Sequence, residues 1–158
     1  VADQVAAAIA GADGGIVRFE TGAEAVTVAL RSIDSLLYER GITHLDILHI
    51  DIQGFERQAL LGAHDTLSNQ RADWIFVSTH RHLEEGRTMD LHAACIELLS
   101  AHGYAIAAAH TPEESFSVDG LVVAKRPGAG GPEYIQLSQL TPALRAAAQA
   151  EAARLTSP

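Results

Sequence analysis

Residues 45–56, Leu-Asp-Ile-Leu-His-Ile-Asp-Ile-Gln-Gly-Phe-Glu, decide the fold. Residues 45–52 are rich in branched apolar side chains, which is typical of a strand that is covered on both faces. Gly54 ends this strand, and apolar residues then recur at helical spacing from residue 55 to residue 67. That spacing predicts one amphipathic helix of about three to four turns. The stretch therefore begins a strand–helix alternation.

The alternation continues downstream and predicts an α/β fold. Helices between successive strands imply right-handed crossovers and a parallel sheet with helices on both sides. The loop before the last strand is too short for a crossover helix, so we expect that strand to run antiparallel to its neighbours. Asp90 is a good N-cap for the second helix, and Gly103 closes it. The predicted elements after residue 67 are strand 74–79, polar loop 81–89, helix 91–102, strand 104–109, loop 111–115 and strand 121–125.

The flanking segments have weaker patterns. Upstream we predict short strands at 16–20 and 26–31, and a helix at 35–40 with N-cap candidates in residues 32–34 and Gly41 after its end. Residues 1–10 resemble the tail of an Ala-rich helix, so the chain is expected to be a fragment. The predicted divisions are a partial α/β domain at 1–126, a linker at 127–133, and a strand/helix appendage at 134–158 whose helix, 143–155, is capped by Thr141.

Length and composition restrict the class of protein. The 158 residues suit one domain, and 47% apolar residues can form a real core. A formal charge of −9 argues against nucleic acid or an anionic membrane surface as a partner, and no apolar run is long enough to span a membrane. Cys95 is the only cysteine and cannot form an internal disulfide, so we expect the protein to work in a reducing compartment, the cytoplasm. A homo-oligomer is left open.

Several polar residues follow the predicted strands. Ligands of open parallel sheets bind beyond the carboxyl ends of the strands, so side chains at those ends should face one cleft. The antiparallel strand should be entered from the same edge. The residues concerned are Asp51, Gln53 and Gly54 at the carboxyl end of the first strand, His80 at that of the second, His110 at that of the third, and Asp119 before the last.

Each candidate also has a structural interpretation. Asp51 follows apolar residues and must be paired or solvated; it could cap the next helix instead of serving a site. His49 shares a strand face with Asp51, yet a lone histidine there is more often a core residue. Glu56 lies in the first turn of a helix, where the dipole favours an acid. His80 could act as a base or a ligand near neutral pH.

Three motifs carry a family resemblance. Residues 32–37 (SIDSLL), 45–56 (LDILHIDIQGFE) and 60–63 (LLGA) resemble the "LDdLL" and "iDllKiDvEGaE…vLkGa" patterns of FkbM-type S-adenosylmethionine-dependent methyltransferases. The likeness extends over about residues 26–126, including a strand that ends in Ser-Thr-His and the Asp119-Gly120 pair. The usual Lys is His49 here and the usual Glu is Gln53, which removes charge and could alter substrate preference or activity.

The resemblance implies a Rossmann-like class I methyltransferase sheet and in-line methyl transfer, with a hydroxyl of a sugar or natural product as acceptor. Asp51 and His80 would be the base and its orienter, with Asp51 and Gly54 also near S-adenosylmethionine. A divalent cation on Asp51 and His80 is a weaker option. The residues expected on the acceptor side are Asp34, Gln53, Glu56 and Asp119.

The resemblance also leaves a gap upstream. Such enzymes hold the methyl donor on a strand, a glycine-rich turn and a helix, and no such pattern precedes Ile16. We therefore expect the carboxyl-terminal part of the domain, which would bind the donor weakly alone. Two other functions stay open: a metal-dependent hydrolase that uses His49, Asp51 and His80, with His82 nearby, or a non-catalytic binding module.

Overall fold

The computed structural model describes residues 16–21, 24–80, 82–84, 87–117, 119–144, 146–147 and 150. The Ala-rich helix tail predicted at residues 1–10 lies outside this part of the chain, as does the end of the predicted helix 143–155. None of the helices within the described ranges is long and apolar enough to cross a membrane.

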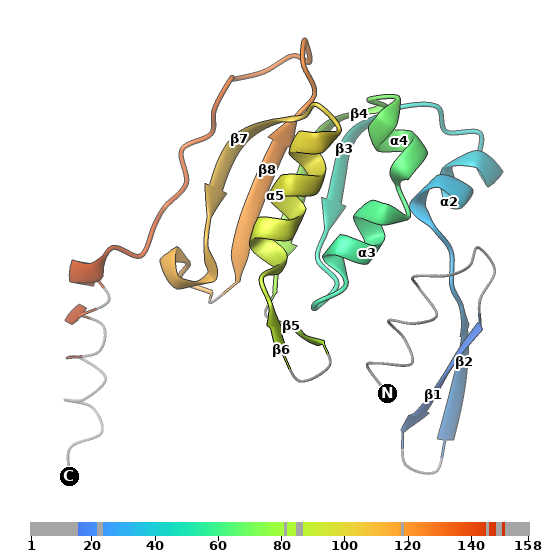
Figure 1. Ribbon diagram of the computed structural model, residues 1–158, viewed down its shortest axis with the longest axis horizontal. Coiled ribbons are helices and arrows are strands. Elements are labelled where there is room, and N and C mark those ends of the chain that lie inside the picture. The colour runs from blue at the N-terminus through green and yellow to red at the C-terminus, as the bar shows by residue number, and fades with distance from the viewer. Residues whose placement is uncertain are drawn as a thin grey trace.

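A four-stranded mixed sheet forms the centre of the molecule (Figure 1), in the order β3-β4-β8-β7. β3 is parallel to β4, whereas β8 is antiparallel to both β4 and β7. The predicted parallel pair and the antiparallel last strand are therefore confirmed, and the fold is mixed α/β. The strands are β3 (Leu45–Ile50), β4 (Ala72–Thr79), β7 (Ala105–His110) and β8 (Gly120–Lys125).

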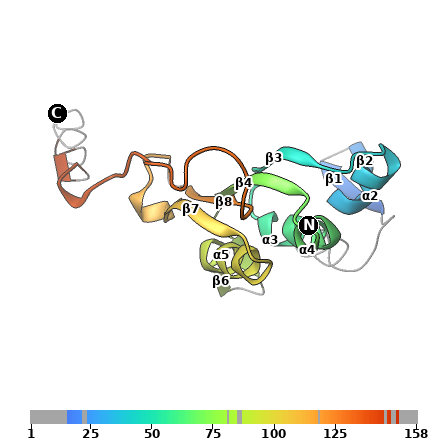
Figure 2. The same ribbon diagram turned by 90° about the horizontal axis from the view of Figure 1, so that it is seen from above.

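Three helices, α3 (Glu56–Leu61), α4 (His64–Ser68) and α5 (Leu91–Ala101), lie on one side of this sheet in Figure 2. Between sheet and helices lies the core, which includes Ile50, Leu60, Leu67, Ile75, Val77, Leu99 and Val122. On the other face Ile47 is 60% exposed. The expectation that residues 45–52 are covered on both faces, with helices on both sides, is therefore wrong for the described part of the chain. A continuous run of branched apolar residues therefore did not show whether helices would cover the second face of this strand.

The helix predicted over residues 55–67 is also interrupted. Gly62 ends α3, and Ala63 is the N-cap of α4. The carbonyl of Gly62 accepts a hydrogen bond from Asp34 N (3.0 Å), and a Cβ on Gly62 would lie 3.3 Å from Ser32 Cβ. The start of the preceding helix therefore packs at the break, which explains why two short helices replace one.

The two strands and the helix predicted upstream of residue 45 are present, with bounds that differ from the prediction by a few residues. β1 (Ile16–Thr21) and β2 (Glu24–Ala29) form an antiparallel hairpin. The helix α2 (Ile33–Glu39) begins two residues earlier than predicted, because Ser32 Oγ accepts a hydrogen bond from Ser35 N and caps it. Gly41 follows the helix with a φ of 65°, as expected for a residue after a helix C-terminus.

The segment predicted as a polar loop, residues 81–89, contains a second hairpin. β5 (His82–Glu84) pairs antiparallel with β6 (Arg87–Met89), so the loop prediction is wrong there. The prediction for α5 is confirmed, since Asp90 Oδ1 accepts from Ala93 N at the start of the helix. A short 3₁₀ turn, η1 (Pro112–Glu114), connects β7 to β8.

The chain after β8 returns along the sheet. Trp74 Nε1 donates to Gly130 O, and Lys125 Nζ donates to the carbonyls of Gly131 and Pro132. Residues 142–144 are helical, and Thr141 Oγ1 accepts from Leu144 N, as the predicted cap requires. The division into a domain, a linker and an appendage stays a prediction.

Candidate functional site

Three chain segments meet at one end of the central sheet. Asp51 follows β3, His80 follows β4, and Asp119 precedes β8. His80 Nε2 lies 3.3 Å from Asp51 Oδ1 and 3.7 Å from Asp119 Oδ1. Because β3 and β4 are parallel neighbours, their carboxyl ends bring these side chains together. The predicted proximity of Asp51 and His80 is confirmed.

A left-handed turn connects β3 to α3 at this site. Gln53 has a φ of 57° and Gly54 a φ of 105°. A positive φ is uncommon for a residue with a side chain and is found preferentially at functional positions. The turn places Gln53 Nε2 2.8 Å from His80 Nε2 and 3.4 Å from Asp51 Oδ1. The strand itself ends at Ile50, two residues before the predicted end.

Glu56 lies beneath the turn and is fully buried. Its Oε1 is 2.7 Å from His80 Nδ1 and accepts hydrogen bonds from Gly54 N (3.0 Å) and Ile52 N (3.4 Å). A buried carboxylate needs such donors to offset its lost hydration. Sequence reasoning placed Glu56 on the acceptor side and missed its contact with His80, for which the only signal was an acid in the first turn after a strand.

Two nearby groups are poorly suited to titrate near neutral pH. Burial, together with the charge of Glu56, raises the pKa of the Cys95 thiol to about 12, so Cys95 is no nucleophile at neutral pH. Burial also lowers the pKa of His92, whose Nδ1 is 3.0 Å from Thr79 Oγ1. We therefore assign neither Cys95 nor His92 a role as the nucleophile or base of this site.

Other predicted site residues lie elsewhere. Asp34 is in α2, where Oδ2 accepts from Asp65 N and Oδ1 accepts from the N–H and hydroxyl of Thr66. Its carboxylate thus caps α4. His110 ends β7, and its Nδ1 lies 3.3 Å from Thr111 O. Among the described residues, His110 makes no hydrogen bond or ion pair with His80.

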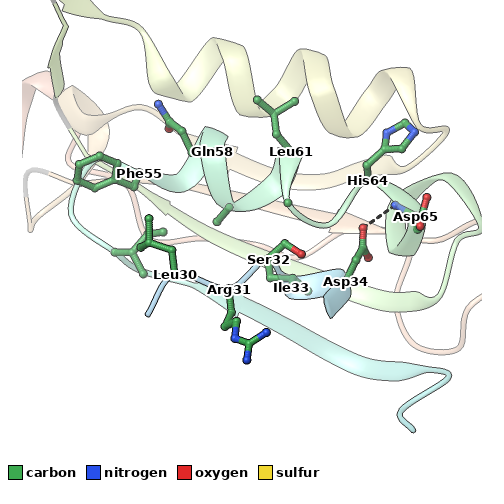
Figure 3. Close-up of a pocket in the computed structure, with 13 residues that line it drawn as sticks. Leu30, Arg31, Ser32, Ile33, Asp34, Phe55, Gln58, Leu61, His64 and Asp65 are labelled. Carbon is green, nitrogen blue, oxygen red and sulfur yellow. Dashed lines mark hydrogen bonds between the residues drawn. The ribbon is translucent and has the colours of Figure 1, made fainter. Parts of the chain in front are cut away.

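A pocket of about 420 Å³ adjoins the turn (Figure 3). Ile52 and Phe55, which flank Gln53 and Gly54, form one part of its wall, and Asp34 belongs to another. The pocket therefore extends from the predicted acceptor-side residue Asp34 to the turn that holds Gln53. Among the described residues, the Asp34 and Gln53 side chains form no hydrogen bond with each other. The remaining walls include Leu30, Arg31, Ser32, Ile33, Gln58, Leu61, His64 and Asp65.

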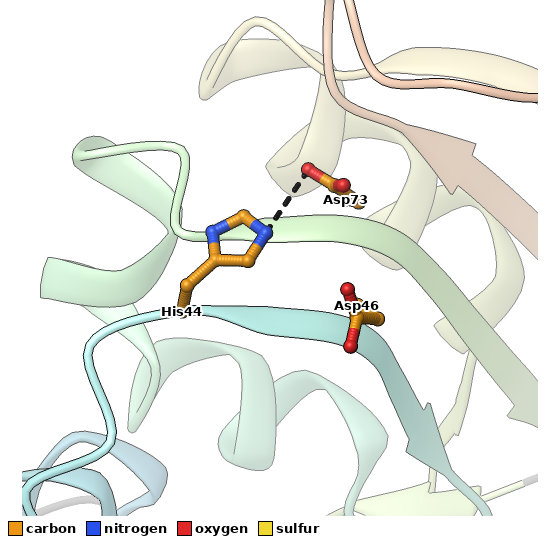
Figure 4. A group of neighbouring side chains, drawn as sticks. All are labelled: His44, Asp46 and Asp73. Atoms are coloured by element: carbon orange, nitrogen blue, oxygen red, sulfur yellow. Dashed lines mark ion pairs between the residues drawn. The ribbon is translucent and has the colours of Figure 1, made fainter.

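The metal-ligand set expected for a hydrolase does not form. His49 is exposed on β3 opposite Phe76, and within the described ranges His49, Asp51 and His80 are not gathered at ligand distances. The described part of the chain gathers one such set, which comprises His44, Asp46 and Asp73 (Figure 4).

That set lies where β3 and β4 begin, at the end opposite His80. His44 Nε2 is 3.3 Å from Asp73 Oδ1, but Arg126 Nε donates to the same oxygen at 2.7 Å. The hydrogen bond from Arg126 lowers the pKa of Asp73, although partial desolvation opposes it. Because the Arg126 guanidinium already pairs with Asp73, we interpret this arrangement as an ion pair with a neighbouring histidine and an exposed Asp46, and we assign it no metal.

The fold and the site define a class: an α/β protein whose polar residues converge beyond parallel strand ends, as in enzymes that bind ligands at that edge. Residues 5–106 match the model of the methyltransferase FkbM domain. The chain therefore belongs to the FkbM methyltransferase domain family, which confirms the resemblance. No curated protein and no solved structure gives a significant match.

Proposed function

We propose that the protein transfers a methyl group from S-adenosylmethionine to a hydroxyl of a small molecule, such as a sugar or natural product. Family membership supports methyl transfer, and the observation that carries the proposal further is the convergence of Asp51, Asp119 and Gln53 on the His80 imidazole. We place the reaction in the cytoplasm. The net charge of −9 disfavours nucleic acid as the acceptor and is compatible with a small molecule.

His80 is the proposed base. Its ring is 9% exposed, and Nε2 is the nitrogen that faces the polar rim. S-adenosylmethionine, when bound, supplies an electrophilic methyl group on a positively charged sulfur. A neutral acceptor hydroxyl must lose its proton as it is methylated, and His80 Nε2 can take that proton. The resulting imidazolium is stabilised by the carboxylates of Glu56, Asp51 and Asp119.

Asp51 and Gly54 are the residues proposed to meet the methyl donor. Asp51 is half-exposed at the rim, so its second oxygen can accept hydrogen bonds from a ligand. Gly54 is buried, so its proposed contribution is to shape the turn beside the donor, for which its φ of 105° suits glycine. The pocket beside Ile52 and Phe55 supplies an apolar wall for the body of the acceptor.

The proposal is tested on the purified protein. We expect S-adenosylhomocysteine binding by calorimetry and transfer of labelled methyl groups to hydroxyl compounds. His80→Gln should lower the transfer rate by roughly 10²-fold or more, the usual contribution of a general base, and leave S-adenosylhomocysteine binding intact. Asp51→Asn should weaken that binding.

Asp46→Asn is the matched control, because Asp46 is exposed at the far end of β3. It should leave both binding and transfer unchanged. If the protein fails to bind S-adenosylhomocysteine, the donor assignment is wrong. If H80Q transfers methyl groups at the wild-type rate, His80 is not the base.

A further inference from the structure

The two ring nitrogens of His80 face very different partners. Nδ1 points to the buried Glu56 carboxylate at 2.7 Å, whereas Nε2 lies at the rim beside Gln53, Asp51 and Asp119. We propose that Glu56 is a positioning residue that holds His80 in the Nδ1–H tautomer and so directs the Nε2 lone pair toward the rim. The use of that lone pair as a base rests on the proposed function; the tautomer itself does not.

The Glu56 side assigns the proton on Nδ1. Glu56 Oε1 already accepts hydrogen bonds from two backbone N–H groups, so it acts as an acceptor and the 2.7 Å contact calls for an N–H on Nδ1 of His80. The carboxylate is fixed by the backbone, because the N–H groups of Gly54 and Ile52 donate to the same oxygen. Since these amides belong to the Gln53–Gly54 turn, the turn that shapes the rim also sets the position of the imidazole.

The Gln53 side assigns the lone pair to Nε2. The amide nitrogen of Gln53 lies 2.8 Å from His80 Nε2, and two N–H groups cannot face each other at that distance. The same amide nitrogen also reaches Asp51 Oδ1 at 3.4 Å, which is consistent with an NH₂ group at this position. The shorter Gln53 contact therefore favours the tautomer with its proton on Nδ1, and it opposes the Asp51 carboxylate, whose Oδ1 lies 3.3 Å from the same Nε2 and favours a proton there.

This arrangement restricts the acceptor. The Gln53 amide presents an N–H to His80 Nε2 at 2.8 Å, and an acceptor hydroxyl must present its O–H to the same nitrogen. The acceptor hydroxyl thus replaces the Gln53 amide when it binds. Asp51 and Asp119 are half-exposed beside this place and disfavour an anionic acceptor by like-charge repulsion. The substrate class that fits is a neutral or cationic alcohol.

The tautomer is measured by two-dimensional ¹H–¹⁵N NMR of the ¹⁵N-labelled chain at about pH 8, above the ordinary histidine pKa of ~6.5. The resonances are assigned to His80 by their loss in His80→Gln. We expect Nδ1 at a shift typical of a protonated nitrogen and Nε2 at one typical of a bare nitrogen. A proton on Nε2, whether alone or together with one on Nδ1, overturns the proposal.

Variants of Glu56 separate positioning from packing. Glu56→Gln keeps an oxygen acceptor and should preserve the Nδ1–H tautomer, whereas Glu56→Met should shift the equilibrium toward Nε2–H. Asp46→Asn is the control, because Asp46 is exposed near the start of β3, at the end opposite His80, and should not change the tautomer. An unchanged tautomer in E56M contradicts the proposal.

Folding is checked from the amide spectrum, and Glu56→Asp, which withdraws the carboxylate from the ring, replaces E56M if that variant does not fold. Neither measurement needs a methyl donor. Failure of the tautomer assignment is therefore distinguishable from failure of the S-adenosylhomocysteine titration.

Discussion

Gly120, the first residue of β8, lies where Thr79, His92 and Pro112 come together. A Cβ there would overlap Thr79 Oγ1 and lie 2.9 Å from His92 Nδ1 and 3.0 Å from Pro112 Cδ. The hydrogen bond between Thr79 and His92 leaves those atoms little freedom to move. We expect Gly120→Ala to lower the free energy of unfolding by about 1–3 kcal/mol, the usual effect of overpacking.

Urea unfolding measures this change. Gly130→Ala is the control, because a Cβ at Gly130 meets no atom within 4 Å and should alter stability by less than about 0.5 kcal/mol. Equal stability of the two variants would show that the segment around Gly120 relaxes without strain. The sequence indicated only that the last strand is entered through Asp119-Gly120, since the close approach of His92 depends on the packing of α5.

At the residue scale, Asp51 and His80 were predictable because each directly follows an apolar strand, and strand direction follows from the strand–helix alternation. The contact between Glu56 and His80 was not predictable. It depends on the positive φ of Gln53, where the family pattern gives no hint of the dihedral angle. Strand ends can be located from hydrophobicity, whereas the direction of a side chain within a turn depends on its dihedrals.

At the scale of elements, the break between α3 and α4 was hidden from the sequence. Apolar spacing from residue 55 to residue 67 fits one helix, and the break is stabilised by Asp34, a residue far away in the chain. The exposed face of β3 was hidden for a similar reason. A run of branched residues shows that a strand can be buried, but not whether a second layer covers it.

The cap on α4 gives a prediction for Asp34. Asp34→Ala removes the acceptor for Asp65 N, Thr66 N and Thr66 Oγ1, so the exposed Asp65 amide and both donors of the buried Thr66 lose their partner. We expect a loss of about 1–2 kcal/mol in the free energy of unfolding, as for other lost helix caps. Chemical denaturation measures it, with Asp46→Ala as the exposed aspartate control, which should change stability by less than about 0.5 kcal/mol.

The result also bears on the predicted acceptor role of Asp34. Its oxygens are engaged within the protein, although the residue lines the pocket in Figure 3. If D34A were as stable as D46A, the capping role would be refuted and the carboxylate would be free to serve a ligand. A destabilised D34A instead identifies a residue that shapes the pocket wall by holding α2 against α4.

At the scale of the whole molecule, residues 127–132 lie against the sheet on the side away from α5 (Figure 2). Composition predicted a linker here, because glycine and proline dominate the segment. Composition says little about docking, which depends on Trp74 of β4 and Lys125 of β8. Substitution of Trp74 or Lys125 can therefore show whether residues 127–132 are held against the sheet by these two side chains.

Lys125 is the side chain to change. Its Nζ donates to Gly131 O (3.0 Å) and Pro132 O (2.9 Å), and it lies 5.2 Å from the centroid of the Trp74 ring. Lys125→Met should release residues 127–132 from Trp74, the only tryptophan, and increase the quenching of its fluorescence by acrylamide. The free energy of unfolding should fall by no more than about 1 kcal/mol, since a cation–π contact at an exposed site contributes ~0.5–1 kcal/mol. Arg40→Met, which removes an exposed charge at the end of α2, should leave the quenching unchanged. Equal quenching in K125M and the wild type would mean that the segment is held without Lys125, or that Trp74 is reached by solvent in both, and either result would contradict a strap fastened by this lysine.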